Sequence, residues 1–401
     1  MKSESMPRGL RKHIALFGRI NAGKSTLFNL IMGQEAAIVS DKAGTTTDPV
    51  MKNMELIPFG PVTLIDTGGL EDTTELGKQR AEKTREFARR ADLGIILTEA
   101  AQYNENNDGK DLFSFFSGGK IYVFSKCDLV DETVLVDIKK KYPDSVFVSK
   151  DNPAAIDNLK KAIIDKLNVL KEADEDTLIG NLLPYGSTVV MVIAVDSEAP
   201  KGRIILPQVQ LIRDCLDHGI KAYVTRETEL EEALTELEKI DLVVTDSQVF
   251  AVVSKIVPAD IPLTSFSMLL ASQKGNFAQF LNGTRHIENL QDGDKILMLE
   301  ACTHNHTHED IGRVKIPALL NKRTGKKLEY VYYGGYNMPG GAEDLTQYSM
   351  AILCGGCMIN KAEVTARLRL LEENNIPTVN YGIILAYLNG ILDRVKTIFE
   401  R

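Results

Sequence analysis

Gly18-Arg19-Ile20-Asn21-Ala22-Gly23-Lys24-Ser25 is the stretch that decides the fold of the first part of the chain, because it matches the pattern G-x-x-x-x-G-K-[ST]. An apolar strand is expected before it, over 13–17, and a helical run follows over 26–32. In such a loop the amides and the helix N-terminus cradle phosphates, the lysine reaches the β- and γ-phosphate oxygens, and the serine binds Mg²⁺. The stretch therefore predicts a P-loop domain. Its nucleotide-binding residues are expected to be Asn21, Ala22, Gly23, Lys24, Ser25 and Thr26.

Two further motifs downstream of the P-loop predict a GTPase. Asp66 and Gly69 stand in a D-x-x-G motif at the end of an expected strand over 62–65. This motif puts the aspartate near the magnesium shell and lets the glycine amide sense a γ-phosphate. Thr46, within Gly44-Thr45-Thr46-Thr47-Asp48, resembles the first-switch threonine that closes on the metal. We expect Ser25, Thr46 and Asp66 to hold Mg²⁺ in the GTP complex.

The base-binding residues are expected after two later strands, over 120–124 and 145–148. Ser125-Lys126-Cys127-Asp128 resembles the guanine motif N-K-x-D, so Asp128 is expected to accept the base N–H donors and Lys126 to flank the base. Ser125 replaces the usual asparagine, which leaves open whether guanine specificity is relaxed. Ser149-Lys150 resembles the third base-contacting motif.

Two residues bear on the rate of hydrolysis. Leu70 follows the D-x-x-G motif where Ras-like proteins keep a water-orienting glutamine, so hydrolysis is expected to be slow without another group. Asn21 occupies the P-loop position at which GTPases resembling the tRNA-modification GTPase family coordinate a monovalent cation. That resemblance implies stimulation by K⁺; the alternative is a loop asparagine that bonds only to its own backbone.

The rest of the chain predicts an α/β protein: an N-terminal P-loop GTPase domain over 1–170, then two further small α/β domains over 180–264 and 265–401, with mainly parallel sheets. Apolar runs predict further strands over 93–97, 188–195, 222–225, 242–245, 295–299, 328–332, 348–353 and 378–380. Helices are expected over 208–217, 229–239, 248–253, 268–282, 361–373 and 383–398. The middle block carries no catalytic constellation, which favours a structural or assembly role.

Composition excludes several classes of protein. A formal net charge of −8 is too acidic for a broad phosphate-backbone surface, so nucleic acid is not an expected partner. No apolar run is long enough to predict a membrane span. Five cysteines behind a short basic tail, rather than an export signal, fit a reducing cytoplasm better than a disulfide framework.

Three cysteines in the third block form a candidate metal site: Cys302, in Cys302-x-His304, and the pair in Cys354-Gly-Gly-Cys357. If their strands are parallel, both segments follow carboxyl ends that line one edge of the sheet. A redox pair would want a helix starting at the first cysteine, whereas helical patterning begins only near Lys361. The spacing of the ligands fits a zinc site that uses His304 and an iron–sulfur cluster equally well. The structural alternative is that the cysteines are simply buried and bind no metal.

Other groups near Cys302 are candidate ligands. His304, His306 and His308 alternate along one segment, which is typical of a metal-facing, a proton-handling or a simply solvated loop. Glu300 lies two residues before Cys302, so in an extended segment both side chains face the same way. Glu300 is therefore a candidate hard ligand.

The order of P-loop domain, small middle domain, Cys-x-His and Cys-x-x-Cys resembles the HydF family, the GTPase maturases of [FeFe]-hydrogenase. The resemblance includes Val195-Asp196-Ser197-Glu198-Ala199-Pro200-Lys201-Gly202-Arg203 and Glu300-Ala301-Cys302-Thr303-His304. It implies a homodimer formed through the middle domain and a [4Fe-4S] cluster on Cys302, Cys354 and Cys357. It further implies a scaffold that accepts a transient two-iron subcluster precursor, assembled with radical-SAM maturases, and delivers it to apo-hydrogenase.

One departure from the family pattern concerns the fourth ligand of the cluster. The family commonly has histidine immediately before the CxxC, where this chain has Leu353. Glu300, His304, water or an exogenous bridge then remain as candidates, and we expect an exchangeable position. The rival function is a tRNA-modification or ribosome-assembly GTPase whose C-terminal domain holds structural zinc; a thiol oxidoreductase would need a reversible Cys354–Cys357 disulfide.

Overall fold

The computed structural model describes residues 9, 11–19, 21–33, 50–67, 84, 87–103, 116, 118–149, 152, 154–173, 177–195, 202, 204–301, 310–339 and 344–400. The chain divides into two compact units, one over Leu10–Asp174 and one formed by Pro7–Gly9 with Glu175–Arg401. The chain therefore passes from the second unit into the first near residue 10, and back near residue 174.

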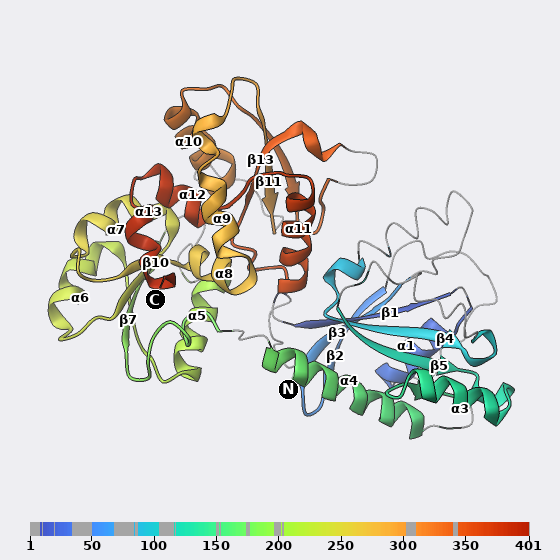
Figure 1. Ribbon diagram of the computed structural model, residues 1–401. Coiled ribbons are helices and arrows are strands. Elements are labelled where there is room, and N and C mark those ends of the chain that lie inside the picture. Colours follow the sequence, from blue (N-terminus) through green and yellow to red (C-terminus); the bar gives the residue numbers. More distant parts are fainter. Residues whose placement is uncertain are drawn as a thin grey trace. The chain divides into compact units, whose positions relative to one another are not determined.

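The first unit is a six-stranded sheet with the strand order β2-β3-β1-β4-β5-β6 (Figure 1). Only β2 runs antiparallel to its neighbour among these described strands. The strands are β1 (Lys12–Gly18), β2 (Val50–Leu56), β3 (Gly60–Asp66), β4 (Leu93–Glu99), β5 (Gly119–Ser125) and β6 (Val146–Phe147). The helices are α1 (Lys24–Met32), α3 (Glu132–Lys141) and α4 (Ala154–Ala173). This arrangement confirms the predicted P-loop fold.

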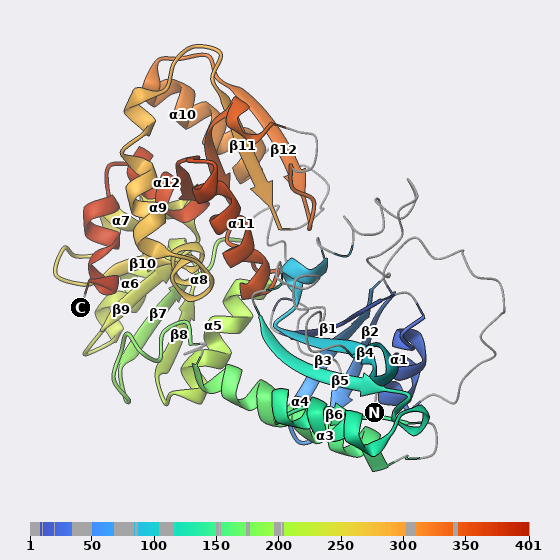
Figure 2. The ribbon, with the colours of Figure 1, turned by 45° about the vertical axis from the view of Figure 1, so that its right-hand side comes forward.

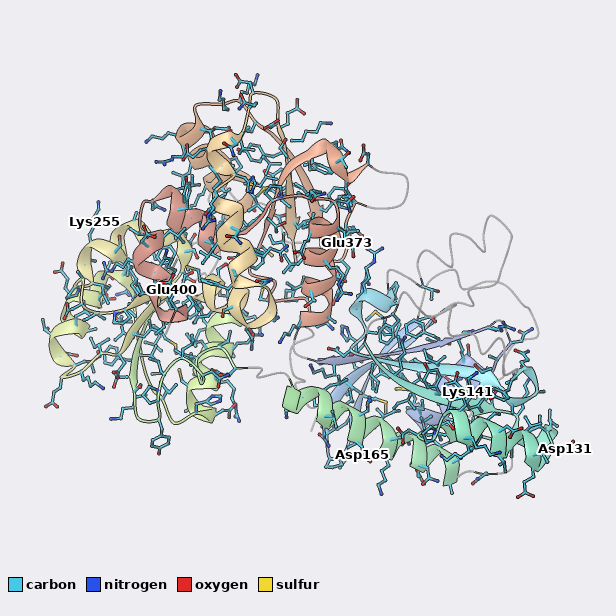
Figure 3. All side chains as sticks on the ribbon, viewed as in Figure 1. Asp131, Lys141, Asp165, Lys255, Glu373 and Glu400 are labelled. Carbon is cyan, nitrogen blue, oxygen red and sulfur yellow. The ribbon has the colours of Figure 1, made fainter. Side chains whose placement is uncertain are left out.

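Apolar side chains of α1 and α4 cover one face of this sheet. Leu27, Phe28 and Ile31 of α1 and Leu159, Ile163 and Leu167 of α4 share a buried cluster with the strands. Charged side chains such as Asp131 and Asp165 project outward from this unit, as Lys255 does from the second (Figure 3). These segments form helices that bury an apolar face against the sheet and keep charged side chains on the outside.

The second unit contains two parallel four-stranded sheets (Figure 2). The first sheet has the order β10-β9-β7-β8 and comprises β7 (Thr188–Val192), β8 (Lys221–Thr225), β9 (Leu242–Thr245) and β10 (Leu263–Ser265). Its helices are α5 (Leu206–Asp217), α6 (Leu230–Glu236) and α7 (Phe250–Ile256). The second sheet has the order β12-β11-β13-β14 and comprises β11 (Lys295–Glu300), β12 (Glu329–Gly334), β13 (Tyr348–Leu353) and β14 (Thr378–Asn380).

The helices that accompany the second sheet are α8 (Phe266–Lys274), α9 (Phe277–Thr284), α10 (Ile316–Thr324), α11 (Lys361–Glu373), α12 (Tyr381–Leu388) and α13 (Leu392–Val395). A π-helical turn, η8 (Ile311–Lys315), precedes α10. Helix α8 packs into two buried clusters. Met268 and Ala271 belong to a cluster that contains residues of both sheets, whereas Leu269 and Leu270 belong to a cluster with Val189, Met191 and Leu242 of the first sheet. The middle of α8 is therefore held by packing on two sides.

Two segments predicted as single helices are each interrupted in the structure. The helix predicted over 268–282 is broken at Gly275, and Asn276 caps the new helix by accepting a hydrogen bond from the Gln279 amide. A Cβ atom at Gly275 would lie 2.6 Å from the ring of Phe280, so the close ring requires glycine there. The helix predicted over 383–398 is divided at Gly390, whose φ of 72° does not continue a helix.

Candidate nucleotide site and cysteine loop

The P-loop backbone follows from its glycines and its asparagine. Asn21 and Gly23 have φ angles of 64° and 94°, the left-handed region that carries the chain round the turn from β1 into α1. A Cβ atom at Gly18 would lie 2.6 Å from the carbonyl oxygen of Leu97. These positions hold the loop close to the carboxyl edge of the sheet, and its amides precede the N-terminus of α1.

Lys24 folds back over this loop. Its Nζ donates hydrogen bonds to the carbonyl oxygens of Gly18, at 3.0 Å, and Arg19, at 2.8 Å. Burial lowers the pKa of Lys24, and the nearby carboxylate of Asp66 partly offsets that shift. A phosphate oxygen would give this ammonium an anionic acceptor in place of neutral carbonyls, so the loop is suited to bind an anion.

Ser25 and Asp66 bring two hard oxygen ligands together from different elements. Asp66 ends β3, which pairs with β1, and the Ser25 hydroxyl donates to its Oδ2 at 2.7 Å. Within the described part of the chain, Oδ1 of Asp66 is buried and accepts no hydrogen bond. Burial raises the pKa of Asp66, against the hydrogen bond from Ser25 and the charge of Lys24. This donor set fits Mg²⁺, which prefers carboxylate and hydroxyl oxygens.

Ser125 connects the base motif to the P-loop. Its hydroxyl donates to the carbonyl oxygen of Ala22 at 3.1 Å. Lys126 has a φ of 55°, and its ammonium lies 2.5 Å from Glu99 at the end of β4. Asp128 is exposed, as a residue that meets a base must be before the base binds. Sequence reasoning missed Glu99, although its place at a carboxyl strand end could have indicated it.

The remaining predicted nucleotide residues divide into two groups. Thr26 lies on α1 with an exposed side chain, and Ser149 follows β6, where its carbonyl oxygen accepts from the Asn152 amide. Thr46, Gly69, Leu70 and Lys150 lie outside the described residues.

Cys354 begins a loop at the carboxyl edge of the second sheet of the second unit. Strands β11 and β13 are parallel, with Leu299 opposite Leu353, so the condition for bringing the two cysteine segments to one edge is met. The Cys354 amide still donates to the Leu299 carbonyl at 3.0 Å. Beyond it the chain turns at Gly356, with a φ of 68°.

The sulfur of Cys354 is surrounded by backbone donors. The amides of Ala301 and Gly356 donate to Sγ at 3.0 and 3.4 Å. Burial raises the pKa of Cys354, and these two amides oppose that shift. Burial raises the pKa of Cys357 to about 11. Two amides are therefore aimed at the Cys354 sulfur, as they would be in a thiolate-ligated centre.

Glu300 is buried, with 4% of its surface exposed, and is held by two partners. Its Oε2 lies 3.2 Å from the Arg313 guanidinium, and its Oε1 accepts from the Tyr381 hydroxyl at 3.4 Å. Burial raises the pKa of Tyr381 well above its ordinary value, so this hydroxyl remains a donor. As a metal ligand, Glu300 would have to share its oxygens with these groups.

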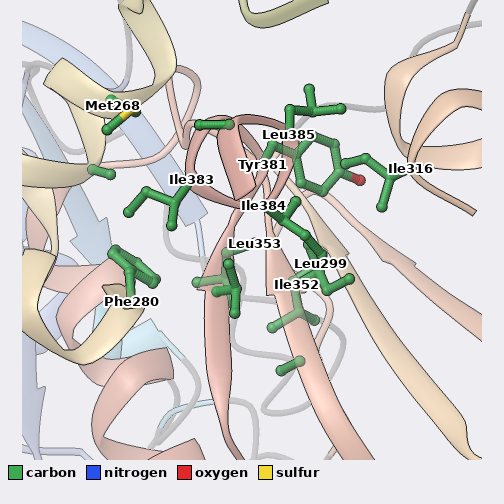
Figure 4. Close-up of a cluster of buried hydrophobic side chains, with 14 of the residues drawn as sticks. Met268, Phe280, Leu299, Ile316, Ile352, Leu353, Tyr381, Ile383, Ile384 and Leu385 are labelled. Atoms are coloured by element: carbon green, nitrogen blue, oxygen red, sulfur yellow. The ribbon is translucent and has the colours of Figure 1, made fainter. Parts of the chain in front are cut away.

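Leu353 shows what replaces the histidine of the family pattern. Its side chain belongs to the buried apolar cluster that also contains Phe280, Ile352 and Ile383 (Figure 4). The position thus contributes packing and not an imidazole. Cys302, His304, His306 and His308 lie outside the described residues. Among the residues that the structure describes, no three metal-binding side chains form a cluster.

Comparison with protein families assigns each part of the chain. Residues 13–123 match the family model "50S ribosome-binding GTPase". Residues 178–275 match "Hydrogen maturase F dimerization domain", and residues 278–398 match "Hydrogen maturase F tetramerization domain". The descriptions of the last two indicate an oligomer-forming protein.

Curated relatives match a limited part of the chain. GTPase Der of Sulfurimonas denitrificans is 34% identical over 41% of this chain and 35% of its own length. The tRNA modification GTPase MnmE of Trichormus variabilis is 32% identical over 44% of this chain and 39% of its own length. The chain thus spans less than half the length of these relatives.

Solved structures with similarity to the chain include GTPases. A single-residue variant of Aquifex aeolicus Era bound to GDP·AlF4⁻ has 19% identity and a TM-score of 0.34, covering 55% of this chain and 93% of that one. The G domain of the T. maritima FeoB iron transporter has 21% identity and a TM-score of 0.30, covering 39% and 99%.

No helix in the described ranges is both long and apolar enough to cross a bilayer. The two hydrogen maturase F models together match more than half of the chain, in sequence order after a GTPase domain. The chain therefore belongs to the hydrogen maturase F (HydF) family of hydrogenase-maturation GTPases.

Proposed function

We propose that the chain is a GTP-hydrolysing scaffold that binds a [4Fe-4S] cluster and assembles or delivers the two-iron precursor of the [FeFe]-hydrogenase active site. The observation that carries the proposal is the cysteine loop at the carboxyl end of β13, beside the strand that leads to Cys302, in a chain of this family. Radical-SAM maturases and apo-hydrogenase are the proposed partners in the cytoplasm.

In the nucleotide site, each residue has a proposed role. Lys24 binds the β- and γ-phosphates with the loop residues Asn21–Thr26, while the Gly69 amide contacts the γ-phosphate. Asp128 and Lys126 bind guanine, helped by Ser149 and Lys150. Mg²⁺, held by Ser25, Thr46 and Asp66, neutralises phosphate charge when it is bound. The tie between Ser125 and Ala22 supports retained guanine specificity.

Hydrolysis is proposed to be slow and stimulated by potassium. Asn21 supports this because its side chain is exposed at the apex of the loop, where a cation beside the phosphates would be reached. Turnover should be several-fold faster in K⁺ than in Na⁺ at equal ionic strength, and Asn21→Ala should remove the difference. Equal wild-type rates in the two salts would contradict potassium dependence.

In the cysteine loop, Cys302, Cys354 and Cys357 are proposed to hold the cluster, with Glu300 or His304 as candidate fourth ligands. The donor set supports this: soft sulfur ligands and two amides directed at one sulfur suit an iron–sulfur centre. The buried packing of Leu353 supports an exchangeable fourth position, because that residue supplies no ligand. A cluster bound by three thiolates would leave one iron open to incoming ligands.

Domain boundaries and assembly follow the same proposal: a GTPase domain over 1–170, dimerisation over 180–264 and cluster binding over 265–401. Large apolar side chains lie exposed near the edge strand β8, including Tyr185 at 88%, Leu216 at 69% and Val224 at 48% exposure. An unpartnered edge strand with apolar neighbours supports pairing with a second copy.

Anaerobic reconstitution with iron and sulfide, followed by incubation with apo-hydrogenase and the partner maturases, tests the function. Wild-type protein should become brown, hold about four iron atoms per chain, and activate hydrogenase. Cys302→Ala and Cys354→Ala should lose iron and activation, whereas Cys215→Ala, at a buried cysteine of helix α5, should lose neither. A colourless protein with one tight zinc would instead support the structural-zinc alternative.

A further inference from the structure

Lys274, the last residue of α8, is a buried cation beside the cysteine loop. Only 3% of its surface is exposed. Its Nζ donates to the carbonyl oxygens of Ile359 at 2.9 Å, Gly356 at 3.0 Å and Gly9 at 3.4 Å. An ammonium has three N–H donors and accepts nothing, so three carbonyl acceptors are the complement of its protonated form.

Two of the three contacts hold the main chain on either side of Cys357. The carbonyl of Gly356 precedes this cysteine, and that of Ile359 follows it by two residues. Helix α8 cannot shift easily, because its side chains enter two cores. The ammonium therefore anchors the loop to a rigid element.

We infer that Lys274 positions the cysteine loop and supplies the local positive charge that stabilises the iron–sulfur cluster, above all in its reduced state. The inference rests on the proposed cluster site. It assigns Lys274 as a positioning residue, because its ammonium bonds to the main chain on both sides of Cys357.

The effect of Lys274 on the cluster follows from the burial of its ammonium and from its positive charge. A buried ammonium is stabilised by negative charge close to it. Thiolates and a cluster supply negative charge, and reduction adds one more, so a fixed cation favours the reduced form.

Arg367 is a second buried cation near the loop. Arg367 donates to the carboxylate of Glu363 at 2.7 Å and to the Gly335 carbonyl at 2.7 Å. Its charge is thus largely balanced by a buried partner. Lys274 and Arg367 both line a cavity of about 10 Å³ under the loop, with Cys354 and Asn380. That volume holds at most one water, so bulk solvent does not screen the ammonium.

Three substitutions separate charge from tethering. Lys274→Met removes both, Lys274→Gln removes the charge but keeps two N–H donors, and Lys274→Arg keeps the charge. The matched control is Lys295→Met, at the opposite end of β11, where the side chain bonds to Gln347. Five residues of strand put it about 16 Å from the carboxyl edge, beyond the Debye length at physiological salt.

The test is an EPR-monitored redox titration of the reconstituted full-length variants, with iron content and hydrogen exchange of the 355–359 amides. Lys274→Gln and Lys274→Met should shift the midpoint potential to more negative values, while Lys274→Arg and Lys295→Met stay near wild type. Apo Lys274→Met should exchange these amides at least several-fold faster than wild type. Loss of iron in Met and Gln but not in Arg would support the same role.

Unchanged midpoint potentials in iron-loaded Lys274→Gln and Lys274→Met would overturn the inference and leave the proposed function standing. Loss of iron in all three variants would also overturn it, because Arg keeps the charge. A wild-type protein that binds no cluster would defeat both, so the two failures are distinguishable. Cys354→Ala marks the cluster-free baseline for every measurement.

Discussion

Two residues of the nucleotide site are placed to bind a ligand in a way that lowers the stability of the nucleotide-free protein. Asp66 and Lys24 are both largely buried, and burial moves each pKa in the direction that disfavours its charge. Their geometry is useful only when Mg²⁺ and phosphate supply the missing opposite charges. Such strain between stability and function is typical of binding sites.

Asp66→Asn should stabilise the nucleotide-free protein while weakening Mg²⁺-dependent GTP binding by about tenfold or more. Because the folded pKa of Asp66 is raised, its ionised form destabilises the fold at pH values above that pKa. The penalty disappears as the pH falls through the folded pKa towards the ordinary aspartate value. The melting temperature of the variant should thus exceed wild type at pH 7, with a smaller gap near pH 4.

Asp137→Asn is the control for that experiment, because Asp137 is an exposed carboxylate on α3. Its melting temperature should follow wild type at both pH values. A destabilised Asp66→Asn at pH 7 would refute the argument from burial.

The two glycines between Cys354 and Cys357 differ in what they require. Gly356 has a φ of 68°, where a side chain is strained, whereas a Cβ at Gly355 would meet its nearest atoms at an ordinary 3.4 Å. Gly356→Ala should therefore lose about 1 kcal/mol of stability and retain less iron. Gly355→Ala should resemble wild type. Urea unfolding and iron content measure both; equal effects would mean that the turn conformation is not the constraint.

Whole elements depend on contacts that the sequence pattern does not display. Asp214 of α5 accepts hydrogen bonds from the amides of Leu178, Ile179 and Gly180 at 2.8–3.2 Å and from the Thr177 hydroxyl at 2.9 Å. This carboxylate therefore links residues 177–180, near the start of the second unit, to helix α5.

Asp214→Asn should lower the free energy of unfolding of the second unit by about 2 kcal/mol, because an amide cannot replace a carboxylate that accepts several N–H donors. Asp217→Asn, on the same helix, removes an exposed pair with Arg213 and should have no measurable effect. Chemical denaturation followed by tyrosine fluorescence compares them. Equal stability of the two variants would contradict the assigned fastening role.

Sequence reasoning succeeded where local pattern and fold agree. The P-loop, the parallel strands and the helix over 361–373 follow from motifs and apolar periodicity, and the structure has them. It missed β2, a largely exposed antiparallel edge strand, and β10, which has three residues. In the sequence, β2 lacks a regular apolar alternation, and the three residues of β10 are too few to show one. The break at Gly275 depends on Phe280 packing, which is a tertiary contact.

For the candidate cysteine site, the sequence predicted that Cys354 follows a parallel strand at the carboxyl edge of the sheet, and the structure has it there. The ligand set with Cys302 stays a prediction. Lys274 could not be singled out, because in the sequence it is an ordinary lysine in a helical segment. Its burial depends on three distant carbonyl groups. The same holds for Ser125, whose partner Ala22 is known only once the sheet is formed.

At the scale of the whole molecule, assembly is expected to run through the middle sheet. Leu216→Asp and Val224→Asp would each put a charge on the exposed apolar surface around β8. If a second copy covers this surface, each should weaken self-association by at least tenfold in analytical ultracentrifugation. Val169→Asp, at an exposed apolar residue on α4 of the first unit, is the control. Unchanged association in both β8-region variants would move the interface elsewhere.

Gly9 lies against the cysteine loop, where a Cβ atom would be 2.4 Å from the Cys357 carbonyl oxygen. It belongs to the second unit although it is followed, three residues later, by the strand that ends in the P-loop. A fragment starting at 175 would therefore lack one of the three acceptors of Lys274. Cutting the chain at that boundary would therefore change the surroundings of Lys274 and of the proposed cluster site, even though the cysteine loop itself stays intact.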